Sequence, residues 1–236
     1  MKIKYKFIIH PLYYFVAFIS FFTGYFRAFT TYTAIMLIHE LGHIFAGLVL
    51  KWPIYKVTLY PFGCITTFNN KINSSSIEEF LVLIYGPLFQ ILFYMIYPTI
   101  YHKYILFFNL LPIYPLDGSK LLLIIFNKFI SFYYSHVLIY IISYITIVVL
   151  LIKNINLMGI IVFTYLIYDT YRYMLILNNY MYKFYYERYL LRRKYRKNNL
   201  IIGNNKHKMF KEKNNYFVID GKYYKESIIL GKMFDK

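Results

Sequence analysis

The residues best suited to chemistry lie in one stretch of five, His39-Glu40-Leu41-Gly42-His43. On a helix, positions i and i+4 lie on one face, so both imidazoles reach the same point in space. Two such imidazoles bind a transition metal, and the carboxylate of Glu40 then acts on a water held by that metal. The spacing therefore predicts a zinc centre for hydrolysis.

The composition indicates that this centre lies inside a membrane. The chain has 236 residues, of which 59% are hydrophobic, 23% aromatic and only 16% charged, too apolar for a soluble domain of this length. The net charge of +17 is concentrated at one end, because 15 of the 27 lysines and arginines follow residue 182. Beside a membrane such a basic segment favours cytoplasmic placement and attraction to anionic lipid, so we expect a lipid bilayer and no nucleic acid as partner.

A polytopic all-α fold is predicted to position the motif. A crossing needs about 20 mostly apolar residues. Six segments qualify, at 7–26, 30–50, 77–98, 104–126, 133–152 and 155–177. The lysines at positions 2, 4 and 6 place the N-terminus in the cytoplasm, and six crossings return the C-terminus to the same side. Between the second and third spans, residues 57–68 are rich in β-formers around a Pro and a Gly, which predicts a small membrane-associated β-hairpin or loop.

The third ligand of a zinc site must come from another span. Asp117 is the acid that lies well inside one, in segment 104–126. The two histidines are about 10–16 Å from the cytoplasmic end of their span, and Asp117 is about 14 Å from the same end of a parallel span. Pro112 and Pro115 break that span, which a membrane tolerates where the backbone is buried or lines a cavity.

The chain is predicted to divide at residue 177. Residues 1–177 would form an intramembrane metalloprotease domain, and residues 178–236 a basic cytoplasmic tail. Within the tail, residues 182–197 are dense in Tyr, Arg and Lys, which favours a helix at the membrane surface, and residues 216–219 form one β-like patch.

Two separated motifs resemble those of the site-2 protease family of intramembrane zinc metalloproteases. They are the His39–His43 stretch and residues 109–118, Asn-Leu-Leu-Pro-Ile-Tyr-Pro-Leu-Asp-Gly. The Gly-Pro-Leu at 86–88 and the Leu-Tyr-Pro-Phe-Gly at 59–63 are also similar to family elements, the latter to the stage IV sporulation protein FB subgroup. The resemblance covers roughly residues 7–126.

The resemblance implies an intramembrane zinc endopeptidase with one Zn²⁺ per chain, held by His39, His43 and Asp117, with Glu40 as general base. It implies that Asn109 and Pro115 help to position substrate. It further implies regulated intramembrane proteolysis of a membrane-associated sigma-factor precursor during sporulation, in the membrane around a developing spore, and inhibitory membrane protein partners. In several members a nucleotide-binding module follows the last span; the tail is too short for one, and we expect none.

Several interpretations stay open from the sequence. Asn109 could stabilise an oxyanion or cap the broken helix, and segment 57–68 could pair with an unwound substrate or be an inert loop. A glutamate, Glu78 or Glu79, could replace Asp117 as ligand, although neither lies in a matching motif. From another functional class, the chain could be a catalytically silent scaffold or transporter with the same fold. Metal content and the effect of Glu40→Gln would separate these possibilities.

Overall fold

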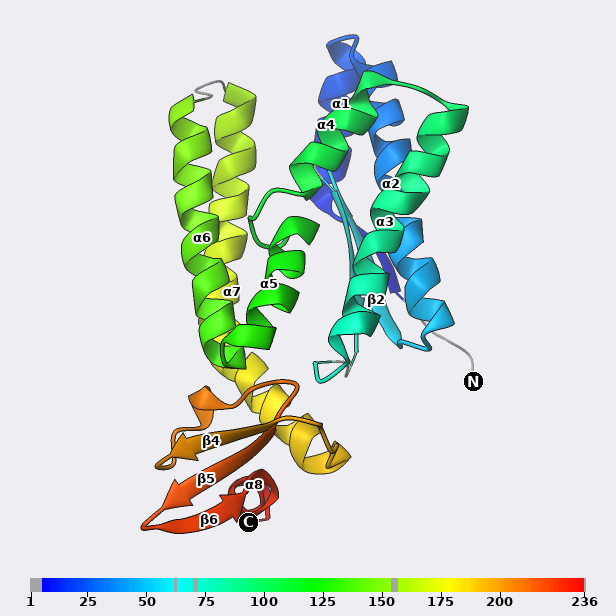
Figure 1. Ribbon diagram of the computed structural model, residues 1–236. Helices are drawn as coiled ribbons and strands as arrows, with labels where there is room; N and C mark the ends of the chain where they lie inside the picture. The colour runs from blue at the N-terminus through cyan, green and yellow to red at the C-terminus, as the bar shows by residue number, and fades with distance from the viewer. Residues whose placement is uncertain (1–5, 62, 70–71, 154–156, 236) are drawn as a thin grey trace. The chain divides into compact units, whose positions relative to one another are not determined.

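The computed structural model describes residues 6–61, 63–69, 72–153 and 157–235 (Figure 1). It is mostly helical, with two small three-stranded sheets. The chain folds into two compact units. The first comprises residues 1–71 and 76–110, and the second residues 72–75 and 111–236.

The first unit is built around a pair of packed helices and a short sheet. Its elements are β1 (Lys6–Ile9), α1 (Pro11–Phe22), α2 (Phe26–Val49), β2 (Ile54–Tyr60), β3 (Gly63–Phe68), α3 (Ser76–Ile96) and α4 (Ile100–Asn109). The helices α2 and α3 pack along each other (Figure 1). The sheet order is β1-β2-β3, with β1 parallel and β3 antiparallel to β2.

The predicted hairpin between the second and third spans is present as β2 and β3. The β-branched residues of this segment favour extended backbone, and the turn at Pro61 separates the two strands. The strand β1 adds to this hairpin, with Lys6 opposite Lys56 and Ile9 opposite Leu59. Residues 7–9 were expected to begin the first span, so this part of the prediction is wrong.

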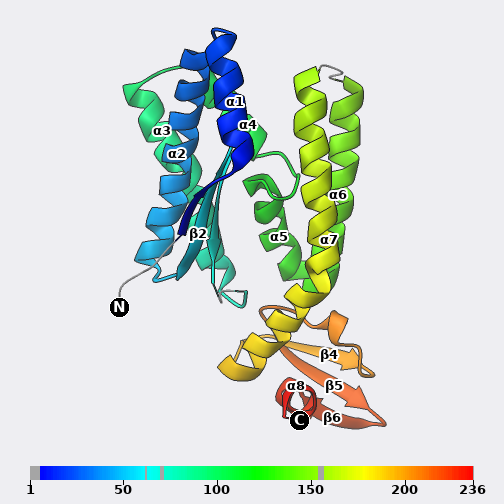
Figure 2. The ribbon, with the colours of Figure 1, turned by 180° about the vertical axis from the view of Figure 1, so that it is seen from behind.

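The second unit contains the remaining elements. They are α5 (Asp117–Phe129), α6 (Phe132–Lys153), α7 (Leu157–Leu191), β4 (Asn198–Ile202), the 3₁₀ turn η1 (Lys206–Lys208), β5 (Asn214–Ile219), β6 (Lys222–Lys225) and α8 (Glu226–Phe234). The helices α6 and α7 pack side by side, and α7 continues without interruption to the second sheet (Figure 2). That sheet has the order β4-β5-β6, with β4 parallel and β6 antiparallel to β5.

Three described helices are long and apolar enough to cross a membrane by length and composition. They are α2, α3 and residues Phe132–Ile152 of α6, and they correspond to the second, third and fifth predicted spans. Together with the fold they indicate an integral membrane protein. By contrast, α1 has 12 residues, about 18 Å, which is short of a hydrocarbon core of about 30 Å.

The fourth predicted span is divided. It begins within α4, is interrupted between Asn109 and Asp117, and resumes as α5. Both predicted breaks, Pro112 and Pro115, lie in this interruption. The sixth predicted span lies within α7, although residues 155 and 156 fall outside the described part of the chain. The total of six crossings therefore stays a prediction.

The tail was expected to hold a helix over residues 182–197 and one β-like patch at 216–219. The end of α7 and β5 correspond to these, and the strands β4 and β6 and the helix α8 were not expected. The end of α7 contributes Leu177, Met181 and Phe184 to a buried core. The tail adds to that core Ile201 and Phe217 of the sheet, Met209 directly after η1, and Ile229 and Leu230 of α8. This stretch of α7 is therefore held by packing against the sheet and α8. It also runs through the predicted domain boundary at residue 177, which stays a prediction.

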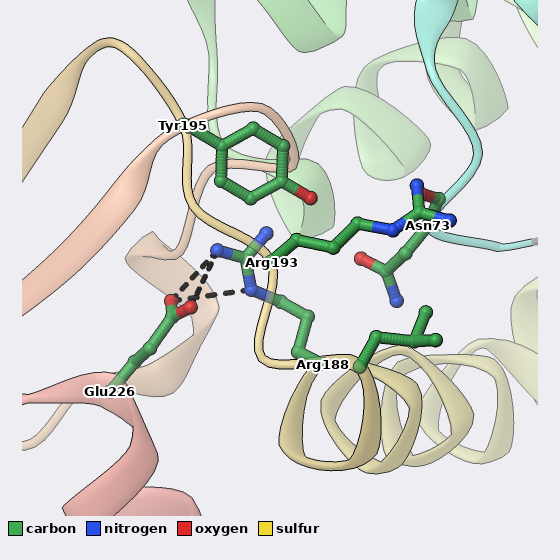
Figure 3. Close-up of a pocket in the computed structure, with 6 residues that line it drawn as sticks. Asn73, Arg188, Arg193, Tyr195 and Glu226 are labelled. Atoms are coloured by element: carbon green, nitrogen blue, oxygen red, sulfur yellow. Dashed lines mark hydrogen bonds and ion pairs between the residues drawn. The ribbon is translucent and has the colours of Figure 1, made fainter.

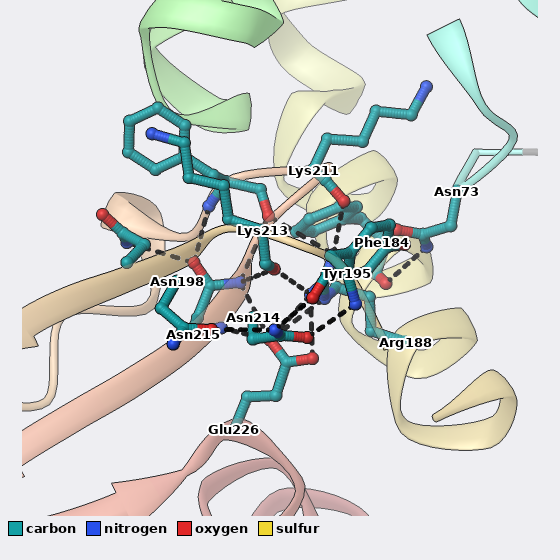
Figure 4. A network of polar contacts seen from close by, with 12 residues as sticks. Asn73, Phe184, Arg188, Tyr195, Asn198, Lys211, Lys213, Asn214, Asn215 and Glu226 are labelled. Atoms are coloured by element: carbon teal, nitrogen blue, oxygen red, sulfur yellow. Dashed lines mark hydrogen bonds and ion pairs between the residues drawn. The ribbon is translucent and has the colours of Figure 1, made fainter. Parts of the chain in front are cut away.

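An ion pair with a buried arginine ties the end of α7 to α8. Arg188 bonds Glu226 through its Nη2 atom at 2.8 Å and donates to the carbonyls of Lys211 and Lys213 at 2.6 and 2.7 Å. The amide of Asn215 also donates to Glu226 (Figure 4). The aromatic ring of Tyr195 lies against the guanidinium beside a small pocket (Figure 3). A buried charge is costly unless it is paired and hydrogen-bonded, and these partners satisfy the guanidinium of Arg188.

Candidate metal centre

Two turns of α2 bring the predicted histidines together. His39 and His43 are 3% and 6% exposed, and their Nε2 atoms lie 3.1 Å apart. Glu40, between them in sequence, is also buried, at 6%. The i, i+4 spacing thus produces the geometry that the motif predicts.

The other ring nitrogen of each histidine has a defined partner on α3. The Nδ1 atom of His43 is 2.8 Å from the backbone carbonyl of Val82, and that of His39 is 2.9 Å from Oε1 of Gln90. A backbone carbonyl only accepts, so Nδ1 of His43 carries the proton and donates it. The Nε2 atom of His43 therefore presents its lone pair toward His39.

This arrangement fits zinc. A tetrahedral ion with Zn–N bonds of about 2.0–2.1 Å holds two ligand nitrogens about 3.3 Å apart, close to the observed separation. Metal-binding histidines commonly donate their second N–H to a carbonyl or carboxylate, as His43 does here. Two buried imidazoles are ligands typical of a zinc enzyme, and a carboxylate is the kind of group that completes such a set.

Glycines let α3 approach the histidines. A Cβ atom at Gly86 would lie 2.3 Å from Nε2 of His43 and 3.0 Å from Nε2 of His39. A Cβ at Gly42 would lie 2.1 Å from the carbonyl oxygen of Tyr85. Pro87 has no N–H to donate to the carbonyl of Leu83, so α3 lacks one backbone hydrogen bond in the turn next to Val82. The Gly-Pro element thus makes room for both imidazoles.

The strand β3 runs beside the same stretch of α2. A Cβ at Gly63 would lie 3.3 Å from Cε of Met36, and one at Gly47 would lie 2.5 Å from the ring of Phe68. Burial, and then the negative charge of Glu40, raise the pKa of the Cys64 thiol. The strand therefore lies within electrostatic reach of the predicted general base.

Asp117 is the first residue of α5, in the second unit. It is 6% exposed, and its Oδ1 atom pairs with Nζ of Lys120 at 3.0 Å. The segment before it is held by α6 and α7. There, Ser143 Oγ accepts from the N–H of Tyr114 at 2.9 Å and Thr170 Oγ1 donates to the Tyr114 carbonyl at 3.2 Å. Asp117 is thus a buried carboxylate at the end of a tethered loop.

The remaining predicted residues are placed as follows. Asn109 is the last residue of α4 and is 8% exposed, and Pro115 lies in the loop before α5. Their roles in substrate binding stay predictions. Glu78, the alternative ligand, lies in the first turn of α3 and accepts from the Trp52 indole at 3.1 Å. That contact gives Glu78 a structural function near the start of α3.

Sequence reasoning missed the partners of the histidines. Gln90 is 1% exposed and bonds His39, yet it belongs to no motif that was considered. A signal was present, because a glutamine inside an apolar helix needs polar partners. Val82 contacts His43 through its backbone carbonyl, which every residue has, so the sequence could not indicate this partner.

Comparison with known proteins supports the resemblance. No protein-family model matches the chain. Over 144 residues the chain is 37% identical to stage IV sporulation protein FB of Bacillus subtilis (strain 168), a match that covers 54% of this chain. The chain spans about half the length of that curated relative, 50%.

The fold has a counterpart among solved structures. The site-2 protease from Methanocaldococcus jannaschii superposes with a TM-score of 0.57 and 20% identity, over 70% of this chain and 89% of that one. At this identity the similarity establishes the fold. The resemblance read from the motifs is confirmed: the chain has the fold of a site-2 protease and is similar in sequence to stage IV sporulation protein FB.

Proposed function

We propose that the chain is an intramembrane zinc endopeptidase that cleaves a membrane-associated protein. One observation carries the proposal: two buried imidazoles on consecutive turns of an apolar helix direct their Nε2 atoms to one point, 3.1 Å apart. Ionisable groups at mid-membrane cost about 2.5–3.5 kcal/mol each on insertion scales, so a purely packing role for this cluster is disfavoured.

Asp117 is the third ligand of this proposed centre, which holds one Zn²⁺ per chain. Its burial, its place at the start of α5 and the tether on the preceding loop support this role. Lys120 neutralises the carboxylate in the present structure. Three protein ligands leave a fourth position for water, as catalytic zinc requires.

Each of the predicted site residues has its own role in peptide hydrolysis. Zinc, when bound, supplies Lewis-acid activation of water and of the scissile carbonyl. The Glu40 carboxylate accepts the proton of the attacking water and passes it to the departing amine. Asn109 has two candidate roles, as an amide donor to the developing oxyanion or as the cap of α4, and Pro115 shapes the loop on the substrate side.

The strand β3 is the proposed docking edge for substrate. A transmembrane helix hides its carbonyls in intrahelical bonds, so the substrate must unwind before cleavage. In the described sheet, β2 is the central strand and β3 pairs with it alone, which leaves one edge of β3 for strand addition. The alternative role for this segment is that of an inert loop.

The similarity to stage IV sporulation protein FB extends the proposal to a biological setting. The substrate is then a sigma-factor precursor processed during sporulation, inhibitory membrane proteins regulate the cleavage, and the membrane is that around the developing spore. Six crossings, with both termini and the basic tail of residues 178–236 in the cytoplasm, complete this topology. The excess of basic residues in the tail supports that orientation.

Two measurements test the function. Metal analysis of the purified protein should find zinc in the wild type and in Glu40→Gln. Co-expression with membrane-tethered sigma-factor precursors should give cleavage by the wild type and none by Glu40→Gln. A wild-type protein without bound metal would instead support a silent scaffold or transporter, and cleavage by Glu40→Gln would assign the general base elsewhere.

A further inference from the structure

We propose that Gln90 is a positioning residue that fixes the His39 tautomer with a lone pair on Nε2, ready for the metal. The inference rests on the proposed zinc site and adds a residue outside its motifs. Gln90 lies on α3 and is 1% exposed. It faces His39 on α2 and the start of α4 at the same time.

The two ends of the Gln90 amide have different partners. Its Nε2 atom donates to the backbone carbonyl of His102 at 2.8 Å, and its Oε1 atom is 2.9 Å from Nδ1 of His39. A backbone carbonyl only accepts, so the amide nitrogen must face His102. The amide oxygen therefore faces His39, and the orientation of the amide follows from its environment.

This orientation determines where the proton of His39 lies. An amide oxygen accepts and never donates, so Nδ1 of His39 carries the hydrogen in the bond to Gln90. The neutral ring then has its lone pair on Nε2, the atom 3.1 Å from Nε2 of His43. The carbonyl of Val82 likewise requires a proton on Nδ1 of His43. Both rings thus direct Nε2 toward the same point before a metal arrives.

The two histidines differ in how this control can be changed. A backbone carbonyl orients His43, and no side-chain substitution removes it. A side chain orients His39, and Gln90 can be replaced. Outer partners of this kind typically contribute about 10- to 100-fold in metal affinity. Substitution of Gln90 therefore measures how much of the zinc affinity depends on holding the His39 proton on Nδ1.

A purely structural role for Gln90 makes a different prediction. Its bond to the His102 carbonyl connects α3 to α4, and loss of that bond alone would loosen the helix pair. Two substitutions separate the roles. Gln90→Glu keeps an acceptor oxygen for His39 in either protonation state, and as a carboxylate it loses the donor to His102. Gln90→Met keeps the length of the side chain and loses both bonds.

The first experiment measures zinc affinity of the full-length protein in detergent, by competition with a chelator. Gln90→Met should bind zinc about 10- to 100-fold more weakly than the wild type, and Gln90→Glu within about threefold of it. Ser135→Ala, a buried change on α6, is the control and should leave affinity unchanged. Wild-type affinity in Gln90→Met, or equal losses in both Gln90 variants, would overturn the proposal.

A second readout does not depend on bound zinc. Nitrogen-15 NMR of the metal-free wild type should show His39 with its proton on Nδ1, and Gln90→Met should show a mixture of tautomers. A His39 without a proton on Nδ1 in the wild type would overturn the proposal even if Gln90→Met fails to fold. If the wild type has the expected tautomer and binds no zinc, the proposed function fails while the role of Gln90 in orienting His39 stands.

Discussion

Replacing Gly86 with alanine should displace a zinc ligand without unfolding the helices. The new methyl group would lie 2.3 Å from Nε2 of His43, about 1.1 Å inside an ordinary contact, which begins near 3.4 Å. Metal–ligand distances vary by about 0.2 Å between sites, so the displacement is several times what coordination tolerates. The bond from Nδ1 to the Val82 carbonyl prevents His43 from moving away freely.

The expected result for Gly86→Ala is a loss of zinc affinity of at least about 100-fold, or about 2.8 kcal/mol. Metal content and chelator competition on the purified protein measure it, with circular dichroism to check helical content. Gly47→Ala is the matched control on α2, because its methyl group would meet the end of the Phe68 ring, at 2.5 Å, and a ring can turn. Wild-type zinc affinity in Gly86→Ala would refute the geometry described for this centre.

Three further predictions concern the ligands, the base and the tail. Asp117→Ala should lose zinc and all cleavage, and full activity would place the third ligand elsewhere. Glu40→Gln should keep its zinc, because Glu40 is no ligand, while its cleavage rate falls about 10²- to 10⁴-fold, as a substrate assay with metal analysis will show. Arg188→Ala leaves the Glu226 carboxylate without its main partner and should destabilise the tail by about 3–5 kcal/mol, seen as faster hydrogen exchange in β4 to β6. Exchange as slow as in the wild type would mean that the apolar core alone holds the tail.

The histidine pair was predictable because its geometry is local. Any α-helix brings residues four apart onto one face, so the sequence of α2 specifies the approach of His39 and His43. The break around Pro112 and Pro115 was predictable for the same reason, since proline acts on its own backbone. The hairpin of β2 and β3 joins neighbouring segments across one turn.

The missed features depend on partners distant in sequence. The pairing of Lys6 with Lys56 joins segments 50 residues apart, and a strand of four residues does not specify such a partner by itself. The tail sheet was obscured by its many basic residues. Its core had a readable pattern, because Met181, Phe184 and Tyr185 follow Leu177 at helical spacing and all are buried.

The continuity of α7 gives the tail a mechanical connection to the loop before Asp117. Phe184 is embedded in the tail core, and Thr170, fourteen residues earlier on the same helix, holds the carbonyl of Tyr114. The ring of Tyr173 also stacks on that of Tyr114, with centroids 3.9 Å apart. These fourteen residues span about 21 Å of helix. Because one helix makes both contacts, a displacement of the tail core would act on the loop before Asp117 through α7.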